Sequence, residues 1–137
     1  MDDAAKPKDT VLILDDEKFL LYMYQIMFEK KGYEVTTFDS ADDALSALRG
    51  GYAPDIILFD VTMPQGRSGY EFLEIMRDEK LGAHSMKIAL TNEGQDGEIK
   101  RLADLGADAH MLKAAYIPSQ LADLVTDLLE KKRGMGK

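Results

Sequence analysis

The chain has 137 residues, of which 45% are apolar and 31% are charged, and it contains no cysteine. This length and composition suit one globular domain with a single core, and they exclude a disulfide-stapled protein, a low-complexity protein and thiol chemistry. The 17 Lys and Arg residues against 25 Asp and Glu residues give a net charge of −8, a surface field that repels phosphate backbones and argues against direct nucleic-acid binding.

Five short apolar segments are predicted as strands. In chain order they are Val11–Leu14, Glu34–Phe38, Ile56–Phe59, Lys87–Leu90 and Ala109–Leu112. The first, third and fourth are almost continuously apolar, which is typical of parallel strands covered on both faces. The second alternates more between apolar and polar residues, which favours a place at the edge of the sheet.

Each strand is followed by a stretch with helical spacing of its apolar residues. These stretches are Phe19–Lys31, Ser40–Arg49, Tyr70–Glu79, Glu98–Leu105 and Pro118–Lys131. Ser40 and Asp43 resemble a capping box, and Pro118 suits the first position of the last helix. Five strand–helix pairs predict an α/β fold, in which a doubly wound parallel sheet carries helices on both faces.

Polar side chains gather where the predicted strands end. Asp15 and Asp16 follow the first strand, Asp60 follows the third, Thr91 ends the fourth and Lys113 follows the fifth. In an open parallel sheet, ligands bind beyond the carboxyl ends of the strands. We therefore expect these five residues to meet at one rim and to form the functional site.

Three carboxylates at one rim repel one another unless a cation compensates their charge. With oxygen ligands alone, Mg²⁺ is the expected cofactor, with Mn²⁺ as an alternative, and zinc is disfavoured. This composition points to phosphoryl chemistry. A carboxylate can act as the nucleophile and carry an acyl phosphate, while the metal, Lys113 and Thr91 bind the phosphoryl oxygens.

At these residues the sequence resembles the receiver domain of two-component response regulators. The resemblance runs from about Thr10 to Lys131 and implies a (βα)5, flavodoxin-like sheet with strand order 2-1-3-4-5. Four motifs carry it in the family's order and spacing: Val11-Leu-Ile-Leu-Asp-Asp16, Ile56-Ile-Leu-Phe-Asp-Val-Thr-Met-Pro64, Ile88-Ala-Leu-Thr91 and Gly106-Ala-Asp-Ala-His-Met-Leu-Lys113.

The resemblance implies a role for each matching residue. Asp60 accepts a phosphoryl group from a phosphohistidine on a histidine kinase or a histidine phosphotransfer protein. Asp15 and Asp16 hold Mg²⁺, with help from Asp60 and the backbone carbonyl of Thr62. Lys113 contacts the phosphoryl group. Such a protein phosphorylates itself from phosphodonors and slowly loses the group, but it is not an enzyme acting on small metabolites.

The resemblance also implies a switch. Thr91 moves to hydrogen-bond the phosphoryl group, and His110 stands where the family has an aromatic residue that changes rotamer with this movement. Thr62 and Glu93 occupy positions that tune dephosphorylation. The family's output face is the fourth helix, the fifth strand and the fifth helix, which contacts a downstream protein and in some members pairs two copies of the chain. The sequence leaves a homodimer open.

Three departures from the family pattern bear on the site. Ala114 follows Lys113 where proline is usual, so we expect a trans peptide bond there. The segment Gln65–Gly69 is one residue longer than usual. Asn92 replaces a small residue and narrows access to the phosphoryl site.

Other interpretations of the same residues remain open. Asp15 and Asp16 can cap the first helix, Lys113 can be a solvated loop lysine, and His110 can be a partly buried packing residue. A scaffold of the same fold that signals without phosphorylation is the main rival function. A phosphohydrolase of the haloacid dehalogenase type is weaker, because Thr62 stands where that family has a second aspartate.

We expect three parts in the chain. They are an N-terminal tail (residues 1–9), a receiver domain (residues 10–131) and a basic C-terminal tail (residues 132–137). No apolar run approaches the roughly 20 residues that cross a bilayer, and the start of the chain does not resemble a signal peptide. We therefore expect a cytoplasmic protein with no membrane partner, either a stand-alone regulator or a piece of a longer one.

Overall fold

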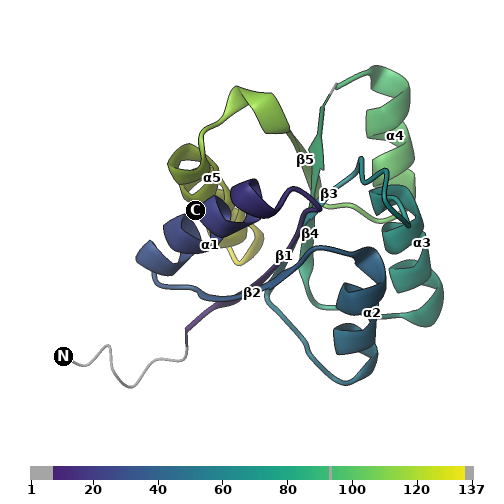
Figure 1. Cartoon of the computed structure of the whole chain (residues 1–137), viewed down its shortest axis with the longest axis horizontal. Helices are drawn as coiled ribbons and strands as arrows, with labels where there is room; N and C mark the ends of the chain where they lie inside the picture. The colour runs from purple at the N-terminus through teal and green to yellow at the C-terminus, as the bar shows by residue number, and fades with distance from the viewer. Residues whose placement is uncertain (1–7, 93, 135–137) are drawn as a thin grey trace.

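The computed structural model of the chain describes residues 8–92 and 94–134, in which strands and helices alternate from β1 to α5 (Figure 1). The strands are β1 (Thr10–Leu14), β2 (Glu34–Phe38), β3 (Ile56–Asp60), β4 (Met86–Thr91) and β5 (Ala109–Leu112). The helices are α1 (Lys18–Lys30), α2 (Ala41–Arg49), α3 (Gly69–Glu79), α4 (Asp96–Asp104) and α5 (Pro118–Lys132). A 3₁₀ turn, Lys113–Ala115, precedes α5. All ten predicted elements are confirmed, and their ends lie within two residues of the predicted ones.

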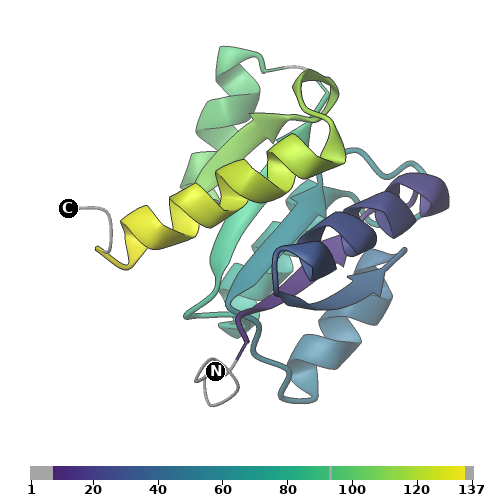
Figure 2. The ribbon, with the colours of Figure 1, turned by 90° about the vertical axis from the view of Figure 1, so that its left-hand side faces the viewer.

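The five strands form one parallel sheet in the order β2-β1-β3-β4-β5, which confirms the predicted doubly wound α/β fold and places β2 at an edge. Helices α1 and α5 cover one face, and α2, α3 and α4 cover the other (Figures 1 and 2). None of the helices in the described part of the chain is long and apolar enough to span a membrane.

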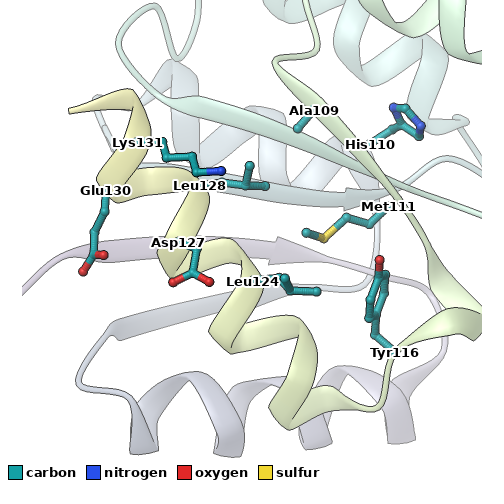
Figure 3. A pocket seen from close by; sticks show the side chains of 9 residues that line it. All are labelled: Ala109, His110, Met111, Tyr116, Leu124, Asp127, Leu128, Glu130 and Lys131. Atoms are coloured by element: carbon teal, nitrogen blue, oxygen red, sulfur yellow. The ribbon is translucent and has the colours of Figure 1, made fainter. Parts of the chain in front are cut away.

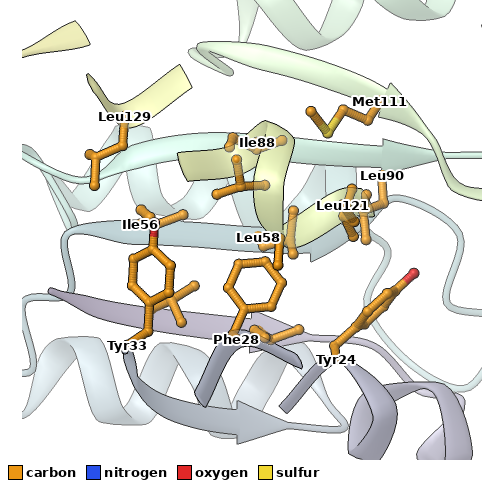
Figure 4. Packing of buried hydrophobic residues seen from close by; sticks show 14 of the residues in the cluster. Tyr24, Phe28, Tyr33, Ile56, Leu58, Ile88, Leu90, Met111, Leu121 and Leu129 are labelled. Carbon is orange, nitrogen blue, oxygen red and sulfur yellow. The ribbon is translucent and has the colours of Figure 1, made fainter. Parts of the chain in front are cut away.

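Each face of the sheet has its own hydrophobic core. Under α1 and α5, the side chains of Tyr24 and Phe28 pack on strand residues such as Leu58 (Figure 4). On the other face, the rings of Phe59 and Phe72 meet with their centroids 5.6 Å apart. Because residues of β1 and β3 are fully buried on both faces, their near-continuous apolar sequence follows from this architecture.

Local capping interactions fix where the helices begin. Ser40 Oγ accepts a hydrogen bond from the backbone N–H of Asp43 at 3.2 Å, which is one half of the predicted capping box. A complete box lies instead at the start of α3, where Ser68 Oγ accepts from the N–H of Glu71 and the Glu71 carboxylate accepts from the N–H of Ser68. Pro118 is the first residue of α5, as predicted.

Gly69 lets the start of α3 lie directly against the end of β3. Its N–H donates to the carbonyl of Val61 at 2.9 Å. A Cβ atom at this position would meet the backbone carbonyl oxygen of Asp60 and would lie 2.6 Å from the Cα atom of Val61. Since both obstacles are backbone atoms, no side-chain adjustment can make room, and α3 can start here only with glycine.

We predict that Gly69→Ala destabilises the fold by about 1–3 kcal/mol, because the added methyl group forces α3 away from β3. Gly97→Ala is the matched control, since Gly97 also lies in a first helical turn but has open space around it. The control should stabilise the protein by roughly 0.5–1 kcal/mol through helix propensity. Urea denaturation measures both changes, and equal midpoints for Gly69→Ala and the unmodified chain would contradict the packing argument.

Candidate functional site

The register of the sheet brings the predicted site residues to one edge. Leu14 of β1 pairs with Phe59 of β3, so the next residue along each strand, Asp15 or Asp60, lies at the same level. Thr91 is the last residue of β4 and pairs with Leu112, which is followed by Lys113. The carboxyl ends of four separate strand segments therefore meet, as a parallel sheet requires.

Three aspartates lie close together at this edge. One carboxylate oxygen each from Asp15, Asp16 and Asp60 lies within 4.8 Å of the others. Asp15 and Asp60 are buried, with 0% and 2% of their surface exposed, whereas Asp16 is partly exposed. A cluster of carboxylate oxygens of this kind can hold a metal ion.

Backbone N–H groups fix the two buried aspartates. Asp15 Oδ1 accepts from the N–H of Glu17 at 2.9 Å, and Asp60 Oδ1 accepts from the N–H of Thr62 at 3.1 Å. Both bonds span two residues, so each aspartate is held by the turn that follows its strand. The Oδ2 atoms of both residues are left to face the centre of the cluster.

Lys113 places its ammonium group between these two Oδ2 atoms. The Nζ atom lies 2.8 Å from Asp15 Oδ2 and 2.9 Å from Asp60 Oδ2. Burial alone would lower the pKa of Lys113, but its contacts with the two carboxylates outweigh burial and raise the pKa, so the group stays charged. Burial raises the pKa of Asp60, and Lys113 offsets this only in part.

The site also holds buried polar atoms without hydrogen bonds. Thr91 Oγ1 is buried and has no hydrogen-bond partner among the described residues. Asp15 Oδ2 contacts only Lys113 Nζ among the described residues, so this carboxylate oxygen can accept a further bond. An acceptor and a hydroxyl left unpaired inside a protein are costly. The vacant bonding capacity of Asp15 Oδ2 fits a metal ion at this cluster.

A cavity of about 440 Å³ opens over the aspartates. Asp16, Asp60, Thr62 and Lys113 line it, whereas Asp15 lies buried beneath and Thr91 is not among the lining residues. The departures noted in the sequence, Asn92 and Ala114, also line it. Sequence reasoning did not assign three further lining residues to the site, Glu17, Leu20 and Pro64, although each lies within a few residues of a predicted site aspartate.

His110 lies apart from this cavity. It is exposed, so it is not the partly buried packing residue that the sequence allowed, and it lines a separate hollow of about 400 Å³ between β5 and α5 (Figure 3). Its role in a switch stays a prediction. Glu93 lies outside the described residues, as do residues 1–7 of the predicted N-terminal tail and residues 135–137 of the predicted C-terminal tail. The peptide bonds among the described residues are all trans, as expected after Lys113.

Comparison with known proteins points to one family. Residues 11–126 match the model of the response regulator receiver domain. The response regulator SaeR of Staphylococcus aureus (strain USA300) is 32% identical over 123 residues, which cover 90% of this chain and 51% of SaeR. The chain therefore spans about half the length of the curated relatives it matches.

Solved structures show the same fold. The chemotaxis response regulator CheY4 of Vibrio cholerae has a TM-score of 0.78 and 25% identity, over 88% of this chain and 98% of that one. A CheY-like receiver domain protein of Methanospirillum hungatei has a TM-score of 0.80 and 24% identity, over 93% and 98% of the two chains.

We predict that Lys113→Met makes the stability of the fold depend on divalent metal. In EDTA the variant should lose about 3–5 kcal/mol, because two buried carboxylates lose the cation that pairs with them among the described residues. Mg²⁺ should restore more stability to the variant than to the unmodified chain. Urea denaturation with and without Mg²⁺ measures this, and Lys100→Met, which removes an exposed ion pair with Asp104, is the control. If Mg²⁺ raised the free energy of unfolding equally in all three proteins, the prediction of a metal site at these aspartates would be contradicted.

We further predict that Asp60→Asn stabilises the metal-free protein at neutral pH. The pKa of Asp60 is raised above its ordinary value of 3.8, so its ionised form disfavours the folded state. This cost is fully present above the folded-state pKa and disappears as the pH falls below the ordinary value. The gain in free energy of unfolding should therefore shrink as the pH is lowered from 7 towards 3.5. A gain that grows as the pH is lowered would contradict this sign.

Proposed function

The chain belongs to the response regulator receiver domain family, and from this premise we propose that it is a phosphorylation-controlled signalling module whose phosphoacceptor is Asp60. The proposed donor is a phosphohistidine on a histidine kinase or a histidine phosphotransfer protein. The observation that carries the proposal is the Lys113 ammonium held between two buried carboxylates, beside a third carboxylate, at the carboxyl edge of the sheet.

The proposed cofactor is Mg²⁺, with Mn²⁺ as an alternative. Asp15, Asp16 and Asp60 would hold it, together with the backbone carbonyl of Thr62. The cluster offers oxygen atoms only, which these ions prefer. When bound, the metal supplies positive charge that neutralises phosphoryl oxygens. The three carboxylates need such a charge, because within the described part of the chain they are paired with one ammonium group, that of Lys113.

In the proposed reaction, a carboxylate oxygen of Asp60 attacks the phosphorus atom of the donor. A P–O bond forms, the P–N bond to the histidine breaks, and the imidazole leaves with the bonding electron pair. The role of the protein is to position Asp60 and to compensate charge. The bond from the Thr62 N–H fixes the orientation of the Asp60 carboxylate, and Lys113 stands ready to contact a phosphoryl oxygen.

Phosphorylation would change the two interactions that hold the site in its present state. The phosphorylated Asp60 can no longer share Lys113 with Asp15 in the same way, and the added phosphoryl oxygens are strong acceptors for the unpaired Thr91 hydroxyl. Thr91 pairs with Leu112 of β5, so a movement of Thr91 acts on the strand that carries His110. The proposed output is a shift in the face formed by α4, β5 and α5, which contacts a downstream protein.

The proposed module is not an enzyme acting on small metabolites. Its own chemistry would be phosphorylation from a donor and slow hydrolysis of the acyl phosphate. Thr62, which lines the cavity beside Asp60, and Glu93 are proposed to set the rate of that hydrolysis.

We predict one labile phosphoryl adduct per chain after incubation with acetyl phosphate and Mg²⁺, measured by intact-mass spectrometry. The adduct should be absent in Asp60→Asn and in excess EDTA. Asp78→Asn is the matched control, since Asp78 is an exposed aspartate on α3 far from the cluster in sequence, and it should be phosphorylated normally. If acetyl phosphate gives no adduct, a phosphorylated histidine phosphotransfer protein is tried as the donor.

Two results would contradict the proposal. An adduct that persists in Asp60→Asn would place the acceptor elsewhere. Failure of both donors, with partner binding unaffected by Asp60→Asn, would favour the rival scaffold that signals without phosphorylation.

A further inference from the structure

A third cavity lies near the amino ends of the strands, whereas the aspartates lie at the carboxyl ends. It has a volume of about 290 Å³ and is bounded by the C-terminal ends of α3 and α4 and the start of β4. Leu73 and Met76 of α3, which are buried, and the partly buried Leu105 form apolar walls. Three cationic side chains also line the cavity: Arg77, Lys80 and Lys87.

Lys87 occupies a costly position. It is the second residue of β4, on the same side of the strand as Ala89, which is fully buried. Burial lowers its pKa, and Asp108, whose carboxylate accepts a hydrogen bond from the Lys87 backbone N–H at 2.8 Å, offsets this effect only in part. The Nζ atom instead donates to the backbone carbonyls of Gly82 and Ser85, at 2.6 and 3.4 Å. An ammonium has three N–H donors, so one remains for another acceptor.

Lys80 has an unfavourable backbone conformation. It follows α3 with φ = 59°, and it is the one residue other than glycine that has a positive φ among residues 8–92 and 94–134. Glycine adopts this conformation without cost, whereas a side chain is strained there. The exposed Lys80 side chain has no hydrogen bond or ion pair within the described part of the chain. By contrast, Arg77 already contacts Asp78 at 3.1 Å and Glu74 at 4.0 Å.

We infer that this cavity binds a small amphipathic carboxylate, with its apolar chain against Leu73, Met76 and Leu105 and its carboxylate at Lys80 and Lys87. Lys80, with its positive φ, and Lys87, with its half-buried charge, both line one apolar cavity. Locally unfavourable residues of this kind are expected at functional sites. Lys80 and Lys87 are positively charged and have unused hydrogen-bond donors, so they favour an anionic ligand. This local positive charge contrasts with the net charge of −8 of the chain. The volume lies at the small end of the roughly 300–1,000 Å³ typical of ligand pockets.

This site does not depend on the phosphoryl chemistry proposed for Asp60. The cavity is lined by residues from the ends of α3 and α4, and none of them lines the cavity over the aspartates. Asp60→Asn should therefore leave ligand binding unchanged, so a failure of the proposed function and a failure of this inference can be told apart.

Octanoate is the probe, and methyl-¹³C methionine NMR is the measurement. The Met76 methyl resonance, assigned by Met76→Leu, should shift and saturate as octanoate is added, whereas 1-octanol and octylamine should bind at least about ten-fold more weakly. Lys80→Gly and Lys87→Met should each weaken octanoate binding about ten-fold or more, because each removes a charged donor. Lys100→Met should bind octanoate like the unmodified chain.

Thermal melting separates ligand binding from a structural role. Lys80→Gly relieves a strained backbone, so it should not lower the melting temperature. Lys87→Met loses the hydrogen bonds to Gly82 and Ser85, so it should melt at a somewhat lower temperature, and its binding is measured where it is fully folded. Lost binding in the folded variants supports the site. Equal binding of octanoate and 1-octanol, unchanged octanoate binding in both lysine variants, or no saturable shift of Met76 would each overturn it.

Discussion

The functional edge of the domain depends on one ammonium group that lies between two buried carboxylates. Lys113 neutralises one of the three aspartate charges, so two negative charges remain. One divalent cation would balance them. Buried charges are tolerated only when they are paired. The edge is therefore electrostatically incomplete by itself, and Asp15 Oδ2 and Thr91 Oγ1 both keep unused bonding capacity. A cluster of this kind can hold a metal ion.

The rest of the fold serves to keep these groups within reach of one another. The pairing of Leu14 with Phe59 sets Asp15 level with Asp60. If the register between β1 and β3 shifted by one residue, side chains would move to the opposite face of the sheet and an aspartate would enter the hydrophobic core. Gly69 then lets α3 approach so closely that the backbone after Asp60 cannot move away. The two hydrophobic cores hold β1 and β3 from both faces, so the aspartates lie at the ends of two strands that are fixed from both sides.

The sequence predicted the elements and the meeting of the site residues, because hydrophobic periodicity marks strands and helices and a parallel sheet sends all strand ends to one edge. It did not predict that Asp15 is buried beneath the cavity while Asp16 lines it, since neighbouring residues of a turn look alike in sequence. The exposure of His110 depends on which side of an edge strand α5 covers. The Ser68 and Glu71 capping box was missed, although its spacing is visible in the sequence.

Negative side chains gather at the carboxyl ends of the strands and positive ones at the amino ends. Helix dipoles explain much of this separation. Each of the five helices has a basic residue in its last turn, which complements the partial negative charge of a helix C-terminus. The same effect would account for Lys80, which ends α3. It does not account for Lys87, which lies in a strand and donates hydrogen bonds to the loop carbonyls of Gly82 and Ser85. No helix dipole explains why Lys87, a half-buried lysine, lies in this strand. Its position is therefore a stronger argument for a ligand in the cavity than the position of Lys80.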